Sequence, residues 1–335
     1  MNHITIGSDR IPRLGYGCMG LTQAYQPVAP DKAMALLQRI VSEGNVMLDT
    51  AATYSGGKNE ILVGTALKTS RSNVFLASKA GMYKNPDGSR EIDGDPNRII
   101  RSCEESLSRL GTEVLDLFYL HRVDQRVPVE ESVGAVDRLI SDGKVRYAGL
   151  SEVSRSTLER ATSVTKIHAL QSEYSLWSRR VEDGVLGYCK TNGIALVAYS
   201  PVGRGFLAGS VRDMAKLWER DIRHGMPRFR GDAFTNNLTV LEQIEMLGLD
   251  WGMTLAQLCL NWLWSRGDHV GAIPGTSELS HWRDDQGATT PLSDEQVGQL
   301  ESLLNAYRFQ GDRYTPDKLA QLDSERSNDP ESPQT

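Results

Sequence analysis

The chain has 335 residues, 39% of them hydrophobic, and a formal net charge of −6. Its length suits one large α/β barrel or two ordinary domains, and the acidity without any basic block gives no electrostatic reason to expect nucleic acid or an anionic membrane as partner. The four cysteines form no CxxC pair or Cys/His cluster, and the N-terminus lacks a basic segment followed by an apolar one, so we expect no metal and a cytoplasmic location.

Eight short apolar or β-branched runs bounded by turn residues are expected to be strands buried on both faces. They lie at 13–17, 45–49, 73–79, 114–121, 144–151, 168–174, 194–200 and 269–275. Segments with helical spacing separate them, among them 31–44, 97–111, 128–143 and 154–162. Eight alternations of strand and helix, with no linker or repeat dividing the chain, favour a single (β/α)8 barrel over an open doubly wound sheet.

The barrel is expected to span residues 1–316. Residues 317–335 end in a polar stretch that contains Pro and Ser, and we expect them to form a disordered tail.

The ends of the predicted strands carry chemically active side chains. In chain order they are Asp49, Lys79, His121, Ser151, Gln171, Tyr199 with Ser200, and Gly275 with Thr276. A barrel gathers its strand ends around one mouth, whereas an open sheet would spread them along an edge. The barrel therefore predicts one active site built from seven separate segments.

The first strand runs into a G-x-G-x-x-G motif at 15–20, which elsewhere marks a dinucleotide-binding Rossmann unit. That mechanism requires a helix to begin within the motif, but Pro27 and Pro30 delay the next helix to about residue 31. We interpret the motif as a loop at the barrel mouth.

Three of the strand-end residues, together with Tyr54, suit proton transfer to a carbonyl. Reduction by hydride leaves an alkoxide, so an acid with an available proton is needed. Tyr54 can serve if Lys79 beside it lowers its pKa and if Asp49 holds that lysine charged. His121 can hydrogen-bond the carbonyl oxygen and share in the relay.

Seven segments resemble the ordered motifs of the aldo-keto reductases: MLDTAATYSGGKNE, FLASKAG, DLFYLHRVD, YAGLSEVS, LQSEYSLWSR, AYSPVGRGFLAG and AIPGTS. The resemblance runs from about Arg13 to Pro316, and the motif forms are most similar to the bacterial and plant branch that includes perakine reductase. It implies NAD(P)-dependent transfer of hydride to an aldehyde or ketone, or reversibly from an alcohol. Asp49, Tyr54, Lys79 and His121 would form the catalytic tetrad, with Tyr54 as general acid and base.

The resemblance also implies a cofactor site. Tyr199 would stack on the nicotinamide, while Ser151 and Gln171 would bind its carboxamide. Two loops would hold the phosphates, because glycines allow backbone N–H groups to approach closely and a helix N-terminus favours anions. Their residues, with the downstream positions assigned to the cofactor, are Ser200, Pro201, Gly203, Arg204, Gly205, Pro274, Gly275, Thr276, Ser277, His281, Asp284 and Asp285.

The segment after Thr276 departs from the family pattern. Relatives that bind the 2′-phosphate of NADPH usually carry Lys or Arg there, whereas this chain has Ser277 and Glu278. Glu278 would repel a phosphate if it pointed inward, and only His281 or Arg283 could pair with that phosphate. NADP(H) is the cofactor that the family implies, with NAD(H) or use of both as the alternative. At Glu152, many relatives carry Asn, a change that we expect to be harmless.

Substrate contacts are expected from loops at the same mouth. The candidates are Met19, Tyr25, Met82, Tyr83, Arg122 and Trp177. The long segment 205–235 is expected to fold over cofactor or substrate.

Two rival functions remain at this point. One is a non-catalytic, cofactor-sensing barrel, as in the β-subunits of potassium channels. The other is a lyase or isomerase in which Lys79 forms a Schiff base, against which Asp49 argues by keeping the lysine charged.

Overall fold

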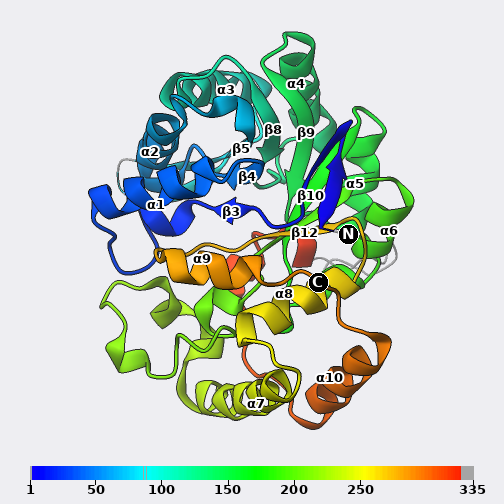
Figure 1. The fold of residues 1–335 in the computed structure, drawn as a ribbon. Helices are drawn as coiled ribbons and strands as arrows, with labels where there is room; N and C mark the ends of the chain where they lie inside the picture. The colour runs from blue at the N-terminus through cyan, green and yellow to red at the C-terminus, as the bar shows by residue number, and fades with distance from the viewer. Residues whose placement is uncertain (1, 86, 88, 326–335) are drawn as a thin grey trace.

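The computed structural model describes residues 2–85, 87 and 89–325. Eight parallel strands pair with their neighbours in chain order around a barrel (Figure 1). A parallel bridge between Leu14 and Ala272 closes the barrel, with Gly15 N donating to Ala272 O at 2.8 Å. The strands are β3 (Tyr16–Gly17), β4 (Val46–Asp49), β5 (Val74–Ala80), β8 (Leu115–Leu120), β9 (Val145–Ser151), β10 (Ile167–Glu173), β11 (Ala195–Tyr199) and β12 (Val270–Ile273).

Helices surround these strands and cover their outer faces (Figure 1). They are α1 (Pro30–Ser42), α2 (Lys58–Leu67), α3 (Pro96–Leu110), α4 (Val129–Ser141), α5 (Arg155–Thr162), α6 (Val185–Thr191), α7 (Gly231–Asp250), α8 (Leu255–Ser265), α9 (Leu279–Gln286) and α10 (Asp294–Ala306). Local chemistry sets their ends: Asp95 caps α3 by accepting from Arg98 N, and Gly111 ends it with a φ of 62°. The predicted (β/α)8 barrel is confirmed.

The barrel interior is filled, so a site can lie only at one end. A hairpin of β1 (His3–Ile6) and β2 (Asp9–Pro12) places Ile4, Ile6 and Ile11 in a buried cluster with inward-facing strand residues such as Phe75. Phe75 and Tyr147 belong to the amino-terminal halves of their strands, so the hairpin closes that end. The carboxyl ends remain as the mouth.

Loops build up the mouth. The hairpin of β6 (Met82–Lys84) and β7 (Arg90–Ile92) follows β5, and short 3-10 turns follow β11. The G-x-G-x-x-G segment at 15–20 runs from β3 into the 3-10 turn η1 (Met19–Leu21), and the next α-helix begins only at Pro30, so no α-helix begins within the motif, as predicted from the sequence.

The carboxyl-terminal segment differs from the expected tail. Residues up to 325 form α11 (Pro316–Leu319) and η9 (Asp323–Glu325), and the Asp323 carboxylate accepts from Ser154 N at 2.8 Å and Oγ at 2.9 Å. These partners lie 169 residues apart, which is why composition alone did not indicate the contact. Residues 326–335 of the predicted tail lie outside the described residues.

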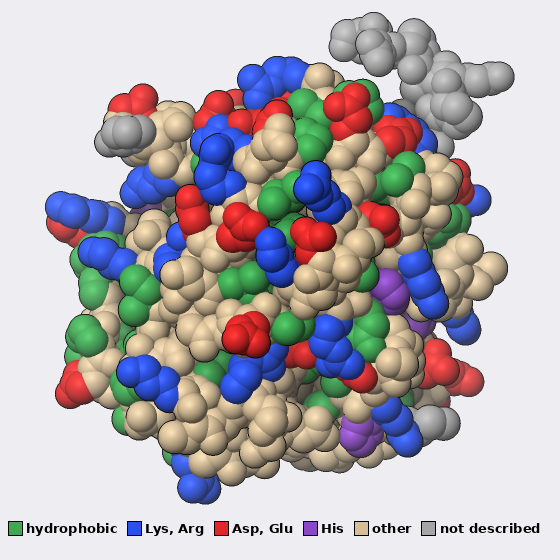
Figure 2. Space-filling view, turned by 90° about the horizontal axis from the view of Figure 1, so that it is seen from above, with side chains coloured by type: hydrophobic (Ala, Val, Ile, Leu, Met, Phe, Trp, Pro, Cys, Tyr) green, Lys and Arg blue, Asp and Glu red, His purple; other side chains and the backbone are tan. Residues whose placement is uncertain are grey.

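Basic and acidic side chains are interspersed on the face seen in Figure 2. No helix among the described residues is long and apolar enough to cross a membrane. The four cysteines are buried and free.

Candidate active site

A buried ion pair lies at the centre of the mouth. Asp49 is the last residue of β4, and Lys79 lies on the adjacent strand β5. Lys79 Nζ pairs with Asp49 Oδ1 and donates to Thr50 O at 2.9 Å and to Tyr54 Oη at 3.4 Å. The side chains of Lys79 and Asp49 are only 0% and 3% exposed. The Lys79 ammonium group therefore contacts both the Asp49 carboxylate and the Tyr54 phenol.

The ion pair keeps the lysine charged despite its burial. Burial alone would lower the pKa of Lys79, but Asp49 and Tyr54 together raise that pKa above its usual value. Burial raises the pKa of Asp49, and Lys79 opposes this rise. Because the two groups are in contact and have further hydrogen bonds, we expect the ionised pair to persist.

Tyr54 holds its proton at neutral pH. Burial raises the pKa of the phenol, and Lys79 opposes that rise without outweighing it. The sequence analysis expected Lys79 to lower the pKa; its effect has that direction, but desolvation prevails in the structure. A protonated phenol beside an ammonium group is suited to donate a proton to an oxygen that becomes negative.

His121 completes the group directly after β8. Its ring centroid lies 6.0 Å from that of Tyr54, with the ring planes at 80°. Burial lowers its pKa far below the usual value, and Arg122 and Lys79 add to this, so the imidazole is neutral. Its buried Nδ1 has no partner among the described residues. The structure thus brings all four predicted residues together.

Asn59, which the sequence analysis missed, holds the Tyr54 loop. This fully buried residue donates from Nδ2 to Cys18 O and Thr22 Oγ1, both at 2.9 Å, and accepts from Thr50 Oγ1 at 2.7 Å. Ser55, at a φ of 49°, is fixed by further bonds to the same 22–23 segment. The only sequence signal was a polar residue on the buried side of α2.

Three residues expected at the nicotinamide lie on consecutive strands. Ser151 and Gln171 pair in register across β9 and β10, and Tyr199 ends β11. Gln171 Nε2 donates to Asp49 Oδ2 at 2.8 Å, and Ser151 Oγ accepts from Arg122 Nη1 at 3.1 Å. The buried Tyr199 hydroxyl has no partner among the described residues. Gln171 thereby contacts the Lys79 pair directly.

The loop from Ser200 through Pro201 to Gly205 is tightly wound. Ser200, Gly203, Arg204 and Gly205 all have positive φ values between 50° and 85°. A Cβ at Gly203 would lie 2.8 Å from Leu207 Cγ, so glycine is required there. The Arg204 guanidinium is turned to Glu173 at 3.2 Å and to Tyr314 Oη at 2.7 Å, so its charge already has protein partners.

The segment from Pro274 to Ser277 leads into α9. A Cβ at Gly275 would lie 2.7 Å from Gly17 O, so the chain crosses closely over the first strand. Tyr16 Oη donates to Thr276 O, and Thr276 Oγ1 lies 3.2 Å from His281 Nδ1. Contacts with residues 16–17 and with His281 therefore fix this loop before it enters α9.

Asp284 and Asp285 follow on α9. Asp284 accepts from Thr254 Oγ1 at 2.9 Å and Gln257 Nε2 at 2.8 Å, so it joins α9 to α8. Asp285 is buried, and burial together with Asp284 raises its pKa to about 7.

Glu278, expected to repel a 2′-phosphate, has a cationic partner. Lys32 Nζ on α1 forms an ion pair with Glu278 Oε1, although the two are 246 residues apart. Both side chains are about half exposed. The structure therefore brings a lysine to the position where the local sequence has none.

The predicted substrate residues have diverse surroundings. Arg122 donates to His121 O at 2.6 Å, beside the four central residues. Met19, Tyr25 and Met82 lie on mouth loops, with Arg223 stacked 4.9 Å above the Tyr25 ring.

Tyr83 and Trp177 face protein partners instead. Arg98 of α3 stacks 3.8 Å from the Tyr83 ring. Trp177 is buried among three phenylalanine rings whose centroids lie 4.5 to 5.3 Å away: Phe206, Phe229 and Phe309. In the described part of the chain, no cluster of three or more potential metal ligands occurs.

The segment 205–230 crosses toward the loop after β3. Ile222 N donates to Ala24 O at 2.9 Å, while Arg223 donates to Arg204 O at 2.9 Å. These bonds connect the glycine-bearing loop with the 22–25 segment across the mouth. Helix α7 begins at Gly231, within the predicted long loop.

Comparison with known proteins identifies relatives over nearly the whole chain. Residues 13–305 match the model of the aldo/keto reductase family. An aldo-keto reductase of Schizosaccharomyces pombe whose name specifies NADP(+) is 36% identical over 318 residues, covering 93% of this chain and 94% of the relative.

Solved structures agree on the architecture. A glycerol dehydrogenase from Gluconobacter oxydans has a TM-score of 0.85 at 24% identity, covering 94% of this chain and 98% of its own, a likeness that concerns the fold alone. An aldo-keto reductase from Klebsiella pneumoniae in complex with NADPH is 26% identical with a TM-score of 0.70, over 96% of this chain and 98% of that one.

Proposed function

The chain belongs to the aldo/keto reductase family, and from that premise we propose that it transfers hydride between a nicotinamide cofactor and an aldehyde or ketone. Tyr54 acts as general acid in reduction and as general base in the reverse oxidation of an alcohol. We propose that the catalytic barrel spans residues 1–316, with the segment from α11 to η9 packed against it. The placement in the branch that includes perakine reductase stays a prediction.

One observation carries the proposal: Lys79 Nζ lies 3.4 Å from Tyr54 Oη while paired with Asp49. The protonated phenol donates to the substrate oxygen as that oxygen gains negative charge, and the ammonium stabilises the phenolate that remains. The neutral His121 can orient the carbonyl oxygen by hydrogen bonding without adding a competing charge.

The residues around the mouth fit a nicotinamide dinucleotide. Two buried polar atoms have no partner in the described chain, His121 Nδ1 beside the Lys79 pair and Tyr199 Oη at the end of β11, and polar ligand groups would satisfy them. Ser151 and Gln171 would hold the carboxamide, and the wound loop at 200–205 would allow its backbone N–H groups to approach a pyrophosphate. The cofactor, when bound, supplies or accepts the hydride; the protein orients it and moves the proton.

We propose NADP(H) as the preferred cofactor. The Schizosaccharomyces pombe relative carries NADP(+) in its name, and the Klebsiella pneumoniae structure is a complex with NADPH. Lys32 offsets the charge of Glu278 and so reduces the repulsion of a 2′-phosphate that the sequence suggested. NAD(H) is the second candidate because no Lys or Arg follows Thr276 directly.

The ion pair argues against a Schiff-base enzyme. A Schiff base requires a neutral amine, but Asp49 and Tyr54 raise the pKa of Lys79 and keep it charged. A cofactor-sensing barrel without turnover is the remaining rival, and it predicts binding without catalysis.

The test combines binding with turnover. NADPH and NADH are titrated separately by quenching of tryptophan fluorescence, and wild type and Tyr54→Phe are assayed on an aromatic aldehyde. We expect both proteins to bind NADPH, with turnover reduced by roughly 10²–10⁴ in the variant. Failure of both nucleotides to bind would overturn the proposal, whereas binding with no wild-type turnover on a panel of aldehydes and ketones would favour the sensing barrel.

A further inference from the structure

Glu152 lies directly after Ser151, the last residue of β9 and one of the two residues expected to bind the nicotinamide carboxamide. Its side chain is 1% exposed, and its φ is 55°. Residues other than glycine rarely adopt this left-handed conformation and keep it only where their surroundings fix it. The path by which the chain leaves β9 therefore depends on the contacts of Glu152.

The backbone of Glu152 joins two segments. Its N–H donates to Gln171 O on β10 at 3.0 Å, and its carbonyl oxygen accepts from Ser324 N of the carboxyl-terminal segment at 3.0 Å. Gln171 is the second residue expected at the carboxamide, and it pairs in register with Ser151. Glu152 is thus bonded covalently to one of these two residues and by a hydrogen bond to the other.

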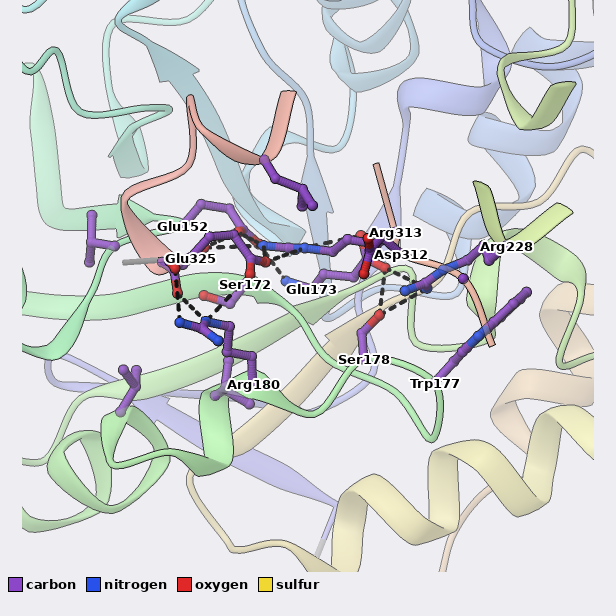
Figure 3. Close-up of a pocket in the computed structure, with 16 residues that line it drawn as sticks. Glu152, Ser172, Glu173, Trp177, Ser178, Arg180, Arg228, Asp312, Arg313 and Glu325 are labelled. Carbon is purple, nitrogen blue, oxygen red and sulfur yellow. Dashed lines mark hydrogen bonds and ion pairs between the residues drawn. The ribbon is translucent and has the colours of Figure 1, made fainter. Parts of the chain in front are cut away.

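The Glu152 carboxylate is held at both of its oxygens (Figure 3). Arg313 donates from Nη1 to Oε1 at 3.1 Å and from Nη2 to Oε2 at 2.6 Å. Oε1 also accepts from Glu173 N at 2.8 Å, and Oε2 accepts from Ser324 Oγ at 2.5 Å. Two bonds from one guanidinium hold a carboxylate more firmly, and in a better defined orientation, than a single contact would. The side chain of Glu152 is therefore fixed chiefly by Arg313.

Arg313 is itself fixed within the carboxyl-terminal segment. Its side chain is 10% exposed, and its Nε donates to Glu325 Oε1 at 2.8 Å. Asp323 anchors the same segment by accepting from the backbone and hydroxyl of Ser154. The guanidinium therefore approaches Glu152 from a segment that is bonded to the barrel.

The ionised state of Glu152 depends on Arg313. Burial would raise the pKa of this carboxyl, but Arg313, with smaller effects of Arg122 and Ser324, holds the pKa at about 2. Among the described residues, only Arg313 forms an ion pair with Glu152. Removing one partner of a buried pair leaves an uncompensated charge, which the surrounding structure must solvate or neutralise. We expect Glu152 to leave its present position when Arg313 is absent.

We propose that Arg313 is a positioning residue for the nicotinamide: by holding Glu152, it fixes Ser151 and Gln171 where they bind the carboxamide. This inference rests on the proposed function, which assigns a nicotinamide cofactor to the mouth. Arg313 contacts no part of the cofactor, and its whole effect passes through Glu152. Its loss should therefore weaken binding of the nicotinamide end and leave the adenosine end, assigned to the segment before α9, unchanged.

The test compares NADPH with 2′-phospho-ADP-ribose, which lacks the nicotinamide ring. Each ligand is titrated separately by isothermal titration calorimetry into wild type and Arg313→Met, at a temperature at which circular dichroism shows both proteins folded. We expect the variant to bind NADPH about five- to tenfold more weakly, with the affinity for 2′-phospho-ADP-ribose within about twofold of wild type. A residue that merely stabilised the fold would weaken the binding of both ligands or of neither.

The matched control is Arg71→Met. Arg71 Nη2 pairs with the buried Asp116 at 2.8 Å near the amino-terminal end of β8, away from the mouth, so its loss should change neither affinity. If Arg313→Met fails to fold, Arg313→Lys replaces it. The lysine keeps the cation but loses the two-pronged contact, and we expect a selective loss of NADPH affinity of about two- to fivefold.

A double variant tests whether Arg313 acts through Glu152. Glu152→Gln keeps the shape of the side chain but removes its charge, and it should reproduce the selective loss of NADPH affinity. In that background, Arg313→Met should weaken NADPH binding by less than about a further twofold. Losses that multiply independently would show that Arg313 acts by another route and would overturn the proposal.

The remaining outcomes are equally decisive. An equal loss of affinity for both ligands in Arg313→Met would reduce Arg313 to a structural role, and unchanged NADPH binding in the folded variant would exclude any role in positioning. Wild type that binds neither NADPH nor NADH would refute the proposed function and this inference with it. Wild type that binds NADPH separates the two, because the comparison of the variants then decides the role of Arg313 alone.

Discussion

Gln171 donates a hydrogen bond of 2.8 Å from Nε2 to Oδ2 of Asp49, across the barrel from β10 to β4. The other oxygen of Asp49 pairs with Lys79, so both carboxylate oxygens are engaged. A residue expected to hold the nicotinamide therefore also holds the carboxylate that keeps the lysine charged. This hydrogen bond therefore links the expected nicotinamide site to the residues proposed to transfer the proton.

Replacing Gln171 by Leu should destabilise the cofactor-free protein. Asp49 would lose its donor at Oδ2 inside the barrel, which we expect to lower the free energy of unfolding by about 1–3 kcal/mol. Urea denaturation measures the change. Gln286→Leu is the control, because its amide donates to Glu43 at 3.1 Å on the exposed surface. Equal stability of the two variants would contradict the role given to Gln171.

Replacing Lys79 by Met should shift the pH dependence of alcohol oxidation. Lys79 opposes the rise in the pKa of Tyr54, so without it the phenol loses its proton only at higher pH. We expect the alkaline rise in kcat for oxidation to move upward in pH and kcat at neutral pH to fall by about 10²–10⁴. The uncompensated Asp49 should also cost about 3–5 kcal/mol of stability. An unchanged pH profile in a folded variant would exclude Lys79 from the proton step.

Replacing Asn59 by Ala should loosen the Tyr54 loop. Three buried hydrogen bonds disappear, and we expect the free energy of unfolding to fall by about 2–4 kcal/mol and kcat to fall more than cofactor affinity. Denaturation and steady-state kinetics check both. Asn192→Ala removes an exposed asparagine whose side chain donates to Tyr188 O at 2.9 Å, and it should change neither quantity. Wild-type kcat in Asn59→Ala would mean that Tyr54 is positioned by other contacts.

Asp285 should make the protein less stable as pH rises toward neutrality. Its pKa is raised from 3.8 to about 7 in the folded state, so its contribution is fully present below pH 3.8 and is lost as pH rises through about 7. The full effect is on the order of 4 kcal/mol. Asp285→Asn should flatten the fall in urea midpoint between about pH 4 and 7. Parallel curves for variant and wild type would show that this carboxyl does not titrate there.

Lys32 should decide between the two nicotinamide cofactors. In Lys32→Met the Glu278 charge loses its partner, and we expect the dissociation constant for NADPH to rise about three- to tenfold with that for NADH unchanged. Fluorescence titration measures both. Lys144→Met, which breaks a comparable surface pair with Glu104, is the control. An equal loss of affinity for both cofactors would mean that Lys32 acts on a part that they share.

Local patterns were enough to predict the barrel and the strand ends. Each buried strand has its own apolar run, and helix ends such as Asp95 and Gly111 are set by a single turn of chain. Because parallel strands in a barrel end at one mouth, the strand positions alone bring Asp49, Lys79 and His121 near one another. That they meet Tyr54 as predicted follows from topology, and their catalytic roles stay predictions.

The tertiary structure decided what lies around those residues. Glu152, expected to be a harmless departure, is the buried partner of Arg313. Arg313 and Ser324 hold the pKa of Glu152 down to about 2 against the effect of burial. The carboxyl-terminal segment that carries Arg313 was in part assigned to a tail.

The sequence by itself thus determined the fold, the family resemblance and the strand-end residues, because these depend on short-range periodicity and on spacing. Only the folded chain decided the partners of Glu152, Glu278 and Gln171, which lie 161, 246 and 122 residues away. The contacts of Glu152 and Glu278 depend on the paths that the loops and the carboxyl-terminal segment take, and that of Gln171 depends on which strands face one another across the barrel. No local pattern encodes such paths, since a charged or amide side chain suits water and a distant partner equally until the backbone brings the two together.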